Sequence, residues 1–162
     1  MVSIRRFEKT DQEQIRELIT TIMSEEFKED QAVFPTADIE NIPQSYGGLG
    51  EAFFVATNGQ QVVGTVAVKR EDDRIALMRR LFVAAAYRKK QIGLQLIDRA
   101  LEFCEEVGYK EVIFRTTSRM ESATKICQKK GFTPRAKLKM GDIELYKLAV
   151  SLRDGLKKVK VS

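Results

Sequence analysis

Histidine is absent from this 162-residue sequence, and cysteine occurs only twice. Without an imidazole, the chain cannot use histidine as an acid, a base or a metal ligand. Cys104 and Cys127 both lie in segments with helical spacing, and neither has a CxxC or Cys/His pattern around it. A disulfide framework or a metal site is therefore not expected, and any chemistry must come from other side chains.

Long apolar runs are missing as well. No segment approaches the ~18 consecutive apolar residues of a membrane-spanning helix, and residues 1–12 lack the apolar core of a signal peptide. We therefore expect a cytoplasmic protein that does not span a membrane. The composition, 43% hydrophobic and 31% charged, is that of an ordinary globular chain. We predict one domain over residues 1–150 and a basic tail over residues 151–162.

The net charge of +5 favours an anionic partner somewhere on the molecule. Nucleic acid is not the partner that we expect, because the basic residues are scattered along the chain. They are also not interleaved with the aromatic side chains on which RNA-reading surfaces stack bases. The position of the positive charge is therefore more informative than its total.

The spacing of apolar residues predicts a mixed α/β protein with a central sheet. Read from the N-terminus, the elements follow the order β-α-β-β-β-α-β-α-β-β. The dipeptide Asn58-Gly59 lies between two β-rich runs and predicts a tight hairpin within a three-stranded meander. Gly108 directly follows a helical pattern from about Gln91 to Val107, where it can serve as a C-terminal cap.

Two helix starts are predicted from capping boxes, in which a hydroxyl and an acid three residues later bond each other's backbone N–H groups. One pairs Thr10 with Glu13 and the other pairs Ser118 with Glu121. Between residues 25 and 50 the helical spacing fades, and two prolines and the glycine cluster YGGLG indicate a loop or a broken helix. Segments of this length are often functional.

A basic turn joins the fourth predicted strand to the helix that follows it. Arg88, Lys89 and Lys90 surround the start of this helix, where unpaired backbone N–H groups and the positive end of the helix dipole also lie. Such a junction is suited to a pyrophosphate. The alternative is that the three cations form an ordinary solvated loop, as most charged runs do.

Three motifs follow one another at this point of the chain. Leu81 and Val83 match an L-x-V strand end, and the segment RKKQIG matches the acyl-CoA signature Q/R-x-x-G-x-G/A at Arg88 and Gly93. The later segment ATKICQKKGF is similar to A-x-x-x-Y-x-x-x-G-F. In these motifs and in their order, the chain resembles the GCN5-related N-acetyltransferase (GNAT) family over nearly its whole length.

The resemblance implies the GNAT fold, acetyl-CoA as the donor and an amine as the acceptor. It implies that the fourth and fifth strands splay apart and that the pantetheine arm lies between them, bonded to the backbone of Leu81, Phe82 and Val83. The side chains of Arg88 and Lys90 would contact the diphosphate. The diphosphate would also lie on the backbone N–H groups of Lys89, Lys90, Gln91, Ile92, Gly93 and Leu94.

Three positions depart from the family's pattern. Gln91 stands where the signature has glycine, which places a Cβ close to the expected phosphate. Cys127 stands where many members carry a tyrosine that protonates the departing CoA thiolate. A thiol is acidic enough for that task, but an unpaired cysteine on an inner helix face is more often a packed hydrophobe. Leu77 stands where many members have a glutamate base.

We predict that the acceptor amine attacks the thioester directly, while the backbone N–H of Phe82 or Val83 polarises the thioester carbonyl. The general base stays open, because a water chain can also remove the amine's proton. The alternative is a non-catalytic acyl-CoA-binding or regulatory module, suggested by the missing acid, base and first glycine. The acceptor can be a small molecule or a protein, and a homodimer is one assembly that the sequence permits. The candidates for the general base are Glu51, Asp72, Asp73, Glu144 and Tyr146. Surface charge or packing also explains each of these residues.

Overall fold

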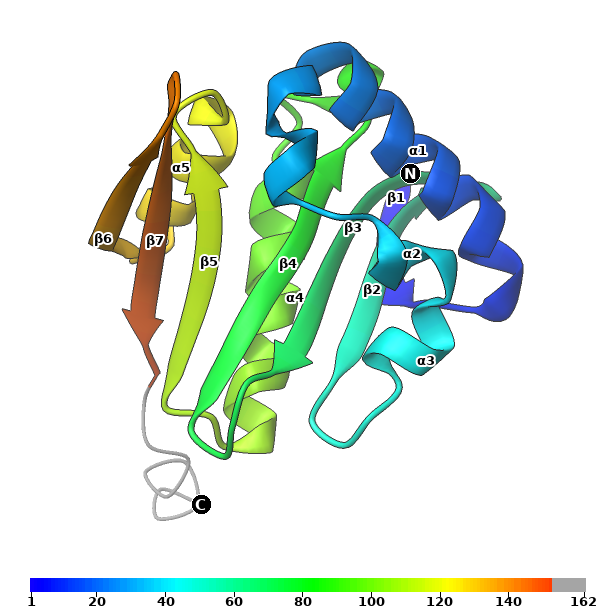
Figure 1. The fold of residues 1–162 in the computed structure, drawn as a ribbon. Coiled ribbons are helices and arrows are strands. Elements are labelled where there is room, and N and C mark those ends of the chain that lie inside the picture. The colour runs from blue at the N-terminus through cyan, green and yellow to red at the C-terminus, as the bar shows by residue number, and fades with distance from the viewer. Residues whose placement is uncertain (153–162) are drawn as a thin grey trace.

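The computed structural model describes residues 1–152 of the chain. Its strands form one sheet in the order β1-β2-β3-β4-β5-β7-β6 (Figure 1), in which only β4 and β5 run parallel. The strands are β1 (Val2–Arg6), β2 (Ala52–Asn58), β3 (Gln61–Arg70), β4 (Ile75–Val83), β5 (Glu111–Thr117), β6 (Thr133–Met140) and β7 (Ile143–Ser151). The helices are α1 (Gln12–Glu26), α2 (Ala37–Glu40), α3 (Ile42–Tyr46), α4 (Ile92–Val107) and α5 (Glu121–Lys129), with 3-10 turns η1 (Lys9–Asp11), η2 (Lys28–Val33) and η3 (Ala85–Tyr87).

Helices cover both faces of the sheet. α1, α2 and α3 lie on one face, and α4 lies on the other with α5 beside it (Figure 1). Because successive side chains of a strand point to opposite faces, Phe53 joins the core under α1 while Phe54 joins the core under α4. β2 and β3 are thus buried on both faces, which explains why their sequences are almost continuously apolar.

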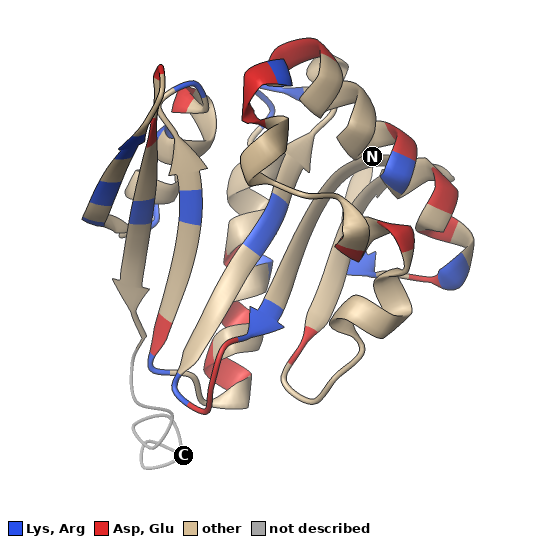
Figure 2. Cartoon of the chain, in the orientation of Figure 1, with Lys and Arg blue, Asp and Glu red and all other residues tan. Residues whose placement is uncertain are grey.

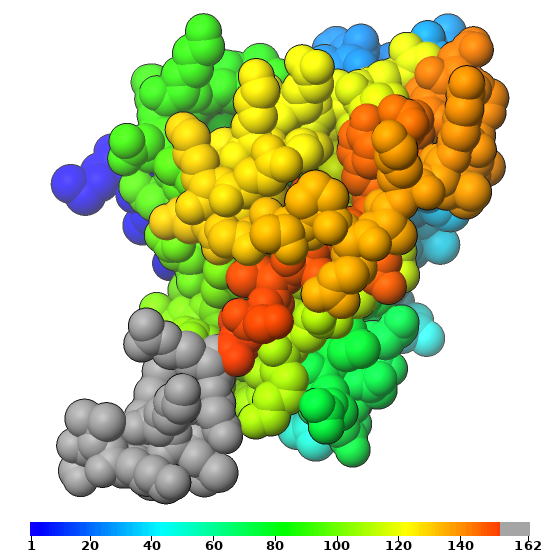
Figure 3. All heavy atoms as spheres, turned by 90° about the vertical axis from the view of Figure 1, so that its left-hand side faces the viewer, coloured from blue at the N-terminus to red at the C-terminus, as the bar shows by residue number. Residues whose placement is uncertain are grey.

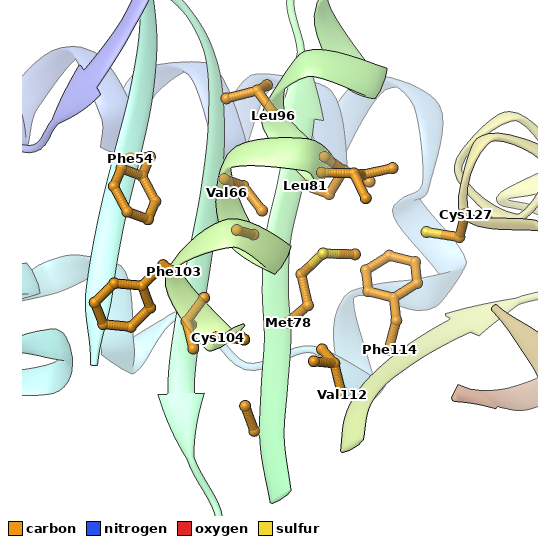
Figure 4. Packing of buried hydrophobic residues seen from close by; sticks show 14 of the residues in the cluster. Phe54, Val66, Met78, Leu81, Leu96, Phe103, Cys104, Val112, Phe114 and Cys127 are labelled. Atoms are coloured by element: carbon orange, nitrogen blue, oxygen red, sulfur yellow. The ribbon is translucent and has the colours of Figure 1, made fainter. Parts of the chain in front are cut away.

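The larger core lies between the sheet and α4 (Figure 4). Leu96 and Phe103 project from α4 onto Phe54, Val66 and the neighbouring strands. The rings of Phe54 and Phe103 meet edge to face with their centroids 5.9 Å apart. Burying each such side chain stabilises the fold by about 1.5–3 kcal/mol, so this core holds α4, and the turn before it, in a fixed place.

The predicted order of elements is confirmed, and so is the hairpin at Asn58-Gly59, where Gly59 has a φ of +64°. Gly108, with a φ of +102°, ends α4 as expected. The segment from residue 25 to residue 50 is a broken helix that comprises η2, α2 and α3. β7 continues through Ser151 and is followed by Leu152, and residues 153–162 of the predicted basic tail lie outside the described residues.

Both predicted capping boxes are wrong. α1 begins directly after η1, and no side chain caps it. Asp11 instead accepts a hydrogen bond from the Glu8 backbone N–H (2.8 Å). α5 also begins without a side-chain cap, because the Ser118 hydroxyl accepts a hydrogen bond from the backbone N–H of Glu144 in β7 (3.1 Å). At the first place a neighbouring local box, formed by Glu8 and Asp11, replaced the predicted pattern. At the second place a contact with β7 replaced it.

β6 forms one edge of the sheet, beside α5 (Figure 3). All of its residues are exposed, and they include Arg135, Lys137 and Lys139. Charged side chains on an edge strand disfavour pairing with another sheet. This edge is therefore protected against strand-to-strand association.

Candidate functional site

A gap opens between β4 and β5 in the middle of the sheet (Figure 1). The two strands pair from Ile75 with Glu111 to Met78 with Phe114, and the pairing ends there. Beyond this point β4 pairs only with β3, and β5 pairs only with β7. Two strand edges with polar backbone groups therefore face each other across the gap.

A β-bulge at Arg80 lies where the two strands separate. The register between β3 and β4 shifts between Thr65 and Ala67, and Arg80 has a φ of +55°. Such a conformation costs a non-glycine residue about 1–2 kcal/mol and persists only where the surroundings fix it. Here the Arg80 carbonyl accepts a hydrogen bond from the Thr65 hydroxyl (2.6 Å). The bulge bends β4 away from β5.

The Arg80 side chain is anchored to the segment that precedes β2. Its guanidinium bonds both carboxylate oxygens of Asp38, with Nε 2.9 Å from Oδ2, and it also bonds the Pro35 carbonyl. The Tyr46 hydroxyl donates to the same carboxylate. Burial would raise the pKa of Asp38, but the hydrogen bonds from Arg80 and Tyr46 outweigh it and hold that pKa below its usual value. Asp38 is thus a charged partner for Arg80 at neutral pH.

The backbone of β4 presents polar groups to the gap. The Ala84 N–H donates to the Val63 carbonyl (2.8 Å), so in the trans peptide before Ala84 the Val83 carbonyl points away from β3. Phe82 lies opposite Thr65 in the next hydrogen-bonded position. The Val83 N–H and the Leu81 carbonyl therefore also point away from β3. Leu81 and Val83 thus offer donors and acceptors to the gap.

Phe82 has a different orientation from its two neighbours. Its own N–H and carbonyl face β3, and its side chain packs against the core under α1. Of the two N–H groups that the sequence offered for polarising a carbonyl in the gap, only that of Val83 points there.

The basic turn and the start of α4 lie at the open end of the gap. Lys89 and Gln91 both have a φ of +66°, and no described side chain caps α4. The first intrahelical bond of this end runs from the Gln95 N–H to the Gln91 carbonyl (3.1 Å). The N–H groups before it point out of the helix. A Cβ on Gly93 would lie 2.8 Å from Ile126, so glycine allows α4 to approach α5 there.

Two of the three cations of the turn have contacts within the protein. The Arg88 guanidinium donates to both carboxylate oxygens of Glu26 (2.7 and 2.8 Å) and to the Val83 carbonyl (3.0 Å). The Lys90 ammonium lies 5.5 Å from the centre of the Tyr87 ring. The sequence did not indicate Glu26, because it lies at the end of α1, 62 residues away. Arg88 therefore links α1 to the turn.

Cys127 lies in the core between α5 and the sheet. Its side chain is fully buried, and Figure 4 shows its sulfur directed toward Phe114. Burial raises the pKa of the Cys127 thiol to about 12, so the thiol is neutral at physiological pH. Cys104 is buried in the same core, and its pKa is also raised to about 12 by burial.

The candidate bases lie away from the gap or are already engaged. Glu51 binds Lys69 and the Arg70 N–H, and Asp72 caps the turn before β4 at the opposite end of that strand. Asp73 pairs with Arg70 in the same turn. In β7, the Tyr146 hydroxyl donates to Glu144 (3.2 Å).

A carboxylate that the sequence did not indicate lies beside the end of β5. Asp30 in η2 is fully buried and accepts a hydrogen bond from the Thr117 hydroxyl (2.5 Å). Its other oxygen lies 3.4 Å from the Arg119 Nε and has no hydrogen-bond donor among the described residues. Only the folded position of η2 brings this acid to the sheet, so no local pattern could have identified it.

Residues 1–152 contain no group of three histidine, cysteine, aspartate or glutamate side chains that could hold a metal ion. Within the same residues, no helix has the length and apolarity needed to span a membrane.

Comparisons with known proteins agree with this geometry. The family described as Acetyltransferase (GNAT) domain matches residues 50–134, which include the gap, the basic turn and α5. N-acetylaspartate synthetase of Danio rerio is 34% identical over 111 residues, which cover 68% of this chain and 38% of that protein. N-acetyltransferase 8 of Homo sapiens is 34% identical over 101 residues, covering 59% and 44%. The chain thus spans about two fifths of the length of these relatives.

Solved structures share the fold over almost the entire chain. An acetyltransferase of the GNAT family from Staphylococcus aureus Mu50 matches with a TM-score of 0.80 and 25% identity, over 94% of this chain and 100% of that chain. The Salmonella typhimurium protein yncA, solved with its cofactor acetyl-CoA, matches with a TM-score of 0.78 and 20% identity, over 94% of each chain. With the family match over more than half of its length, this chain belongs to the GNAT family of acetyltransferases.

Proposed function

We propose that this protein transfers the acetyl group of acetyl-CoA to an amine. The observation that carries the proposal is the gap between β4 and β5. The gap leads from its closed end at the last strand pair, Met78 and Phe114, which we call the apex, to the uncapped start of α4. The gap offers the polar backbone groups of Leu81 and Val83, and the turn beside it offers N–H groups and cations. Membership of the GNAT family supports acetyl-CoA as the molecule that fits them.

In the proposed complex the pantetheine arm adds a short strand to the free edge of β4. Its amides bond the Leu81 carbonyl and the backbone of Val83, as a peptide does when it pairs with a sheet edge. The diphosphate lies on the backbone N–H groups from Lys89 to Leu94, where it meets the positive end of the α4 dipole. Lys89 and Lys90 supply compensating charge, and Arg88 contributes if it exchanges Glu26 for a phosphate oxygen.

The reaction is a direct transfer. The neutral amine attacks the thioester carbon, the new C–N bond forms, and the C–S bond breaks as the tetrahedral intermediate collapses. The Val83 N–H stabilises the developing oxyanion. The amine gives its surplus proton to water, and the CoA thiolate takes a proton from water. We assign Cys127 to packing in this scheme, because a fully buried thiol is poorly placed to exchange protons with solvent.

The acceptor is proposed to be a small molecule. The name of the Danio rerio relative indicates acetylation of aspartate by that protein. An amino acid is therefore the first class of acceptor to test on this chain.

A non-catalytic acyl-CoA-binding module is the second candidate. The buried Cys127 and the apolar Leu77 favour it, since many family members have an acid and a base at these positions. Both candidates predict that CoA binds, and only the first predicts that it turns over.

The test combines binding with turnover. Native mass spectrometry of gently purified protein measures retained CoA, and thermal unfolding with added CoA measures binding. A ligand present at 100 times its dissociation constant stabilises a protein by about 2.7 kcal/mol. Release of free thiol from acetyl-CoA with a panel of amines measures transfer. Binding with no transfer to any amine would favour the non-catalytic module, and no stabilisation at millimolar CoA would contradict both candidates.

We also propose that the chain forms one domain over residues 1–150 and is located in the cytoplasm. The two cores share the strands of one sheet, which supports the single domain. The two cysteines are both free and buried, which suits a reducing compartment. A homodimer stays a prediction, and sedimentation of the purified protein would test it.

A further inference from the structure

Basic residues occupy neighbouring positions on β4, β5 and β7 where β4 and β5 separate, seen as blue bands on these strands (Figure 2). They are Arg79 in β4, Arg115 in β5 and Lys147 in β7. Each directly adjoins, along its strand, a residue of the core under α4, namely Met78, Phe114 and Leu148. Because neighbouring side chains of a strand point to opposite faces, all three cations point to the face that carries α1 and η2.

Arg115 and Lys147 have no acidic partner within residues 1–152, whereas the charge of Arg79 helps to lower the pKa of Asp38. Arg115 and Lys147 are directly opposite each other in the β5–β7 pairing, an arrangement in which like charges repel. Within residues 1–152, none of the three cations forms an ion pair or a side-chain hydrogen bond. Other arginines on the same side of the sheet do have partners, since Arg80 binds Asp38 and Arg119 lies beside Asp30.

A cavity of about 240 Å³ lies over two of these cations. Arg115 and Lys147 line it together with Leu138 and Leu145 of the β6–β7 hairpin. Val33, the last residue of η2, and Phe34 form another wall. Arg79 lies outside this lining, in β4. The cavity thus combines apolar walls with the charges of Arg115 and Lys147, which nothing in residues 1–152 neutralises. Lys137 also lines it and is paired with Glu144 (3.6 Å).

The cavity adjoins the apex of the gap. Arg115 is the first residue of β5 beyond the last pair with β4. The turn that would hold the diphosphate follows the far end of β4, so a pantetheine arm that enters there runs toward the apex. Its acetyl group would end near Arg115.

We propose that this cavity holds the anionic part of the acceptor, and that the acceptor is a small amine carrying at least one carboxylate. The inference rests on the proposed acetyl transfer and names its acceptor class. The Arg115 guanidinium binds the carboxylate through two parallel N–H bonds, Lys147 adds a second charge, and the apolar walls contact the carbon skeleton. The amine is thereby directed toward the thioester at the apex.

The first test compares amino acids with their amides. L-alanine and β-alanine are measured against their amides, and L-aspartate against its diamide, with acetyl-CoA saturating in a thiol-release assay. The amides keep the amine and lose the negative charge. We expect kcat/KM to favour the acids by at least about tenfold, because a hydrogen bond to a charged group contributes about 1.5–3 kcal/mol. Equal kcat/KM values for acids and amides would overturn the inference while leaving the proposed function intact.

The second test uses variants with a matched control. Arg115→Gln and Lys147→Gln should each raise KM for the acids about tenfold or more, with KM for acetyl-CoA unchanged. Lys139→Gln removes the same charge from the opposite face of the β6–β7 hairpin and should leave both KM values unchanged. Since neither Arg115 nor Lys147 has an internal partner, their variants should unfold at the wild-type temperature or above it. Unchanged KM for the acids in folded Arg115→Gln and Lys147→Gln would overturn the inference.

A binding measurement separates this inference from the proposed catalysis. Isothermal titration of L-aspartate, L-alanine and β-alanine into CoA-loaded protein requires no turnover. Binding to the wild type that is lost in Arg115→Gln would support the anion site even if no acetyl group were transferred. If none of the three acids binds or reacts, the inference fails, and the CoA experiments still decide the proposed function.

Discussion

Replacing Gln91 by glycine should stabilise this protein relative to the same replacement at Gln95. Gln91 precedes α4 with a φ of +66°, in the left-handed region. An L residue loses about 1–2 kcal/mol there because of its Cβ, and glycine has no Cβ. Gln95 is exposed within the first turns of α4. Glycine at that position should instead cost roughly 0.5–1 kcal/mol of helix stability.

The comparison isolates the backbone conformation. Both variants replace an exposed glutamine by glycine, so the added entropy of the unfolded chain, about 0.4–1 kcal/mol, cancels between them. The remaining difference is the strain at Gln91, so the free energy of unfolding of Gln91→Gly should exceed that of Gln95→Gly by about 1–2 kcal/mol. With a urea m-value of about 2 kcal/mol/M, the two midpoints should differ by roughly 0.5–1 M.

Urea unfolding of the two variants and the wild type measures this difference, and unchanged m-values would confirm that only stability has changed. Equal loss of stability in both variants would refute the reasoning, since it would mean that the Gln91 Cβ causes no strain. CoA affinity of Gln91→Gly provides a second readout. If phosphate approaches this backbone, removing the Cβ should leave the affinity equal or higher.

Three further predictions concern the gap and its supports. Arg88→Ala should weaken CoA binding by about threefold to tenfold and make that binding less sensitive to salt in calorimetric titrations. Glu26→Gln, which frees the guanidinium, should not weaken CoA binding. Unchanged affinity in Arg88→Ala would mean that this cation serves only contacts within the protein. Cys127→Ala should change kcat less than about tenfold and lower the free energy of unfolding by roughly 1 kcal/mol through lost packing. A hundredfold loss of kcat in a folded variant would instead identify Cys127 as the acid. Asp38→Asn should cost about 3–5 kcal/mol at pH 7, because the buried charge of Arg80 loses its partner. Since the pKa of Asp38 is lower in the folded than in the unfolded protein, its carboxylate stabilises the fold above about pH 4 and this contribution disappears as the pH falls through the lowered pKa. Urea unfolding between pH 3 and pH 7 should therefore show that the free energy of unfolding falls less steeply with falling pH in Asp38→Asn than in the wild type. The same pH dependence in both proteins would contradict this account.

Sequence patterns predicted the parts of the fold whose cause is local. Asn58-Gly59 specifies its hairpin because the turn needs residues that tolerate a positive φ, and Gly59 has one. The basic turn could be placed before α4 because the spacing of a strand, three cations and a helix is contained within about fifteen residues. One capping box failed because a distant element competed, since Ser118 bonds Glu144 in β7 instead of the start of α5. The other failed because a local alternative formed, the box of Glu8 and Asp11 at η1.

Local sequence patterns could not identify the residues on the acceptor side of the site. Asp30 and Asp38 lie in the segment where the helical spacing fades, and each acquires its role from a residue far along the chain. Asp38 meets Arg80, 42 residues away, and Asp30 meets Thr117, 87 residues away. Arg115 and Lys147 are ordinary strand residues in the sequence. Their pairing becomes visible only when the register of β5 and β7 places the two cations opposite each other.

The buried pair of Arg80 and Asp38 explains how the chain maintains an open gap inside a sheet. Separating β4 from β5 leaves backbone groups of both strands without ladder partners, which a sheet normally avoids. A buried ion pair adds little net stability compared with apolar packing, so stability alone does not account for this pair. The pair does fix the backbone, because it ties the bulged residue of β4 to α2 while the Thr65 hydroxyl binds its carbonyl. With β4 held in this bend, the Leu81 carbonyl and the Val83 N–H stay free for a ligand, beyond the apex that Arg115 adjoins. One polar contact thus maintains both the proposed donor site and the proposed acceptor site.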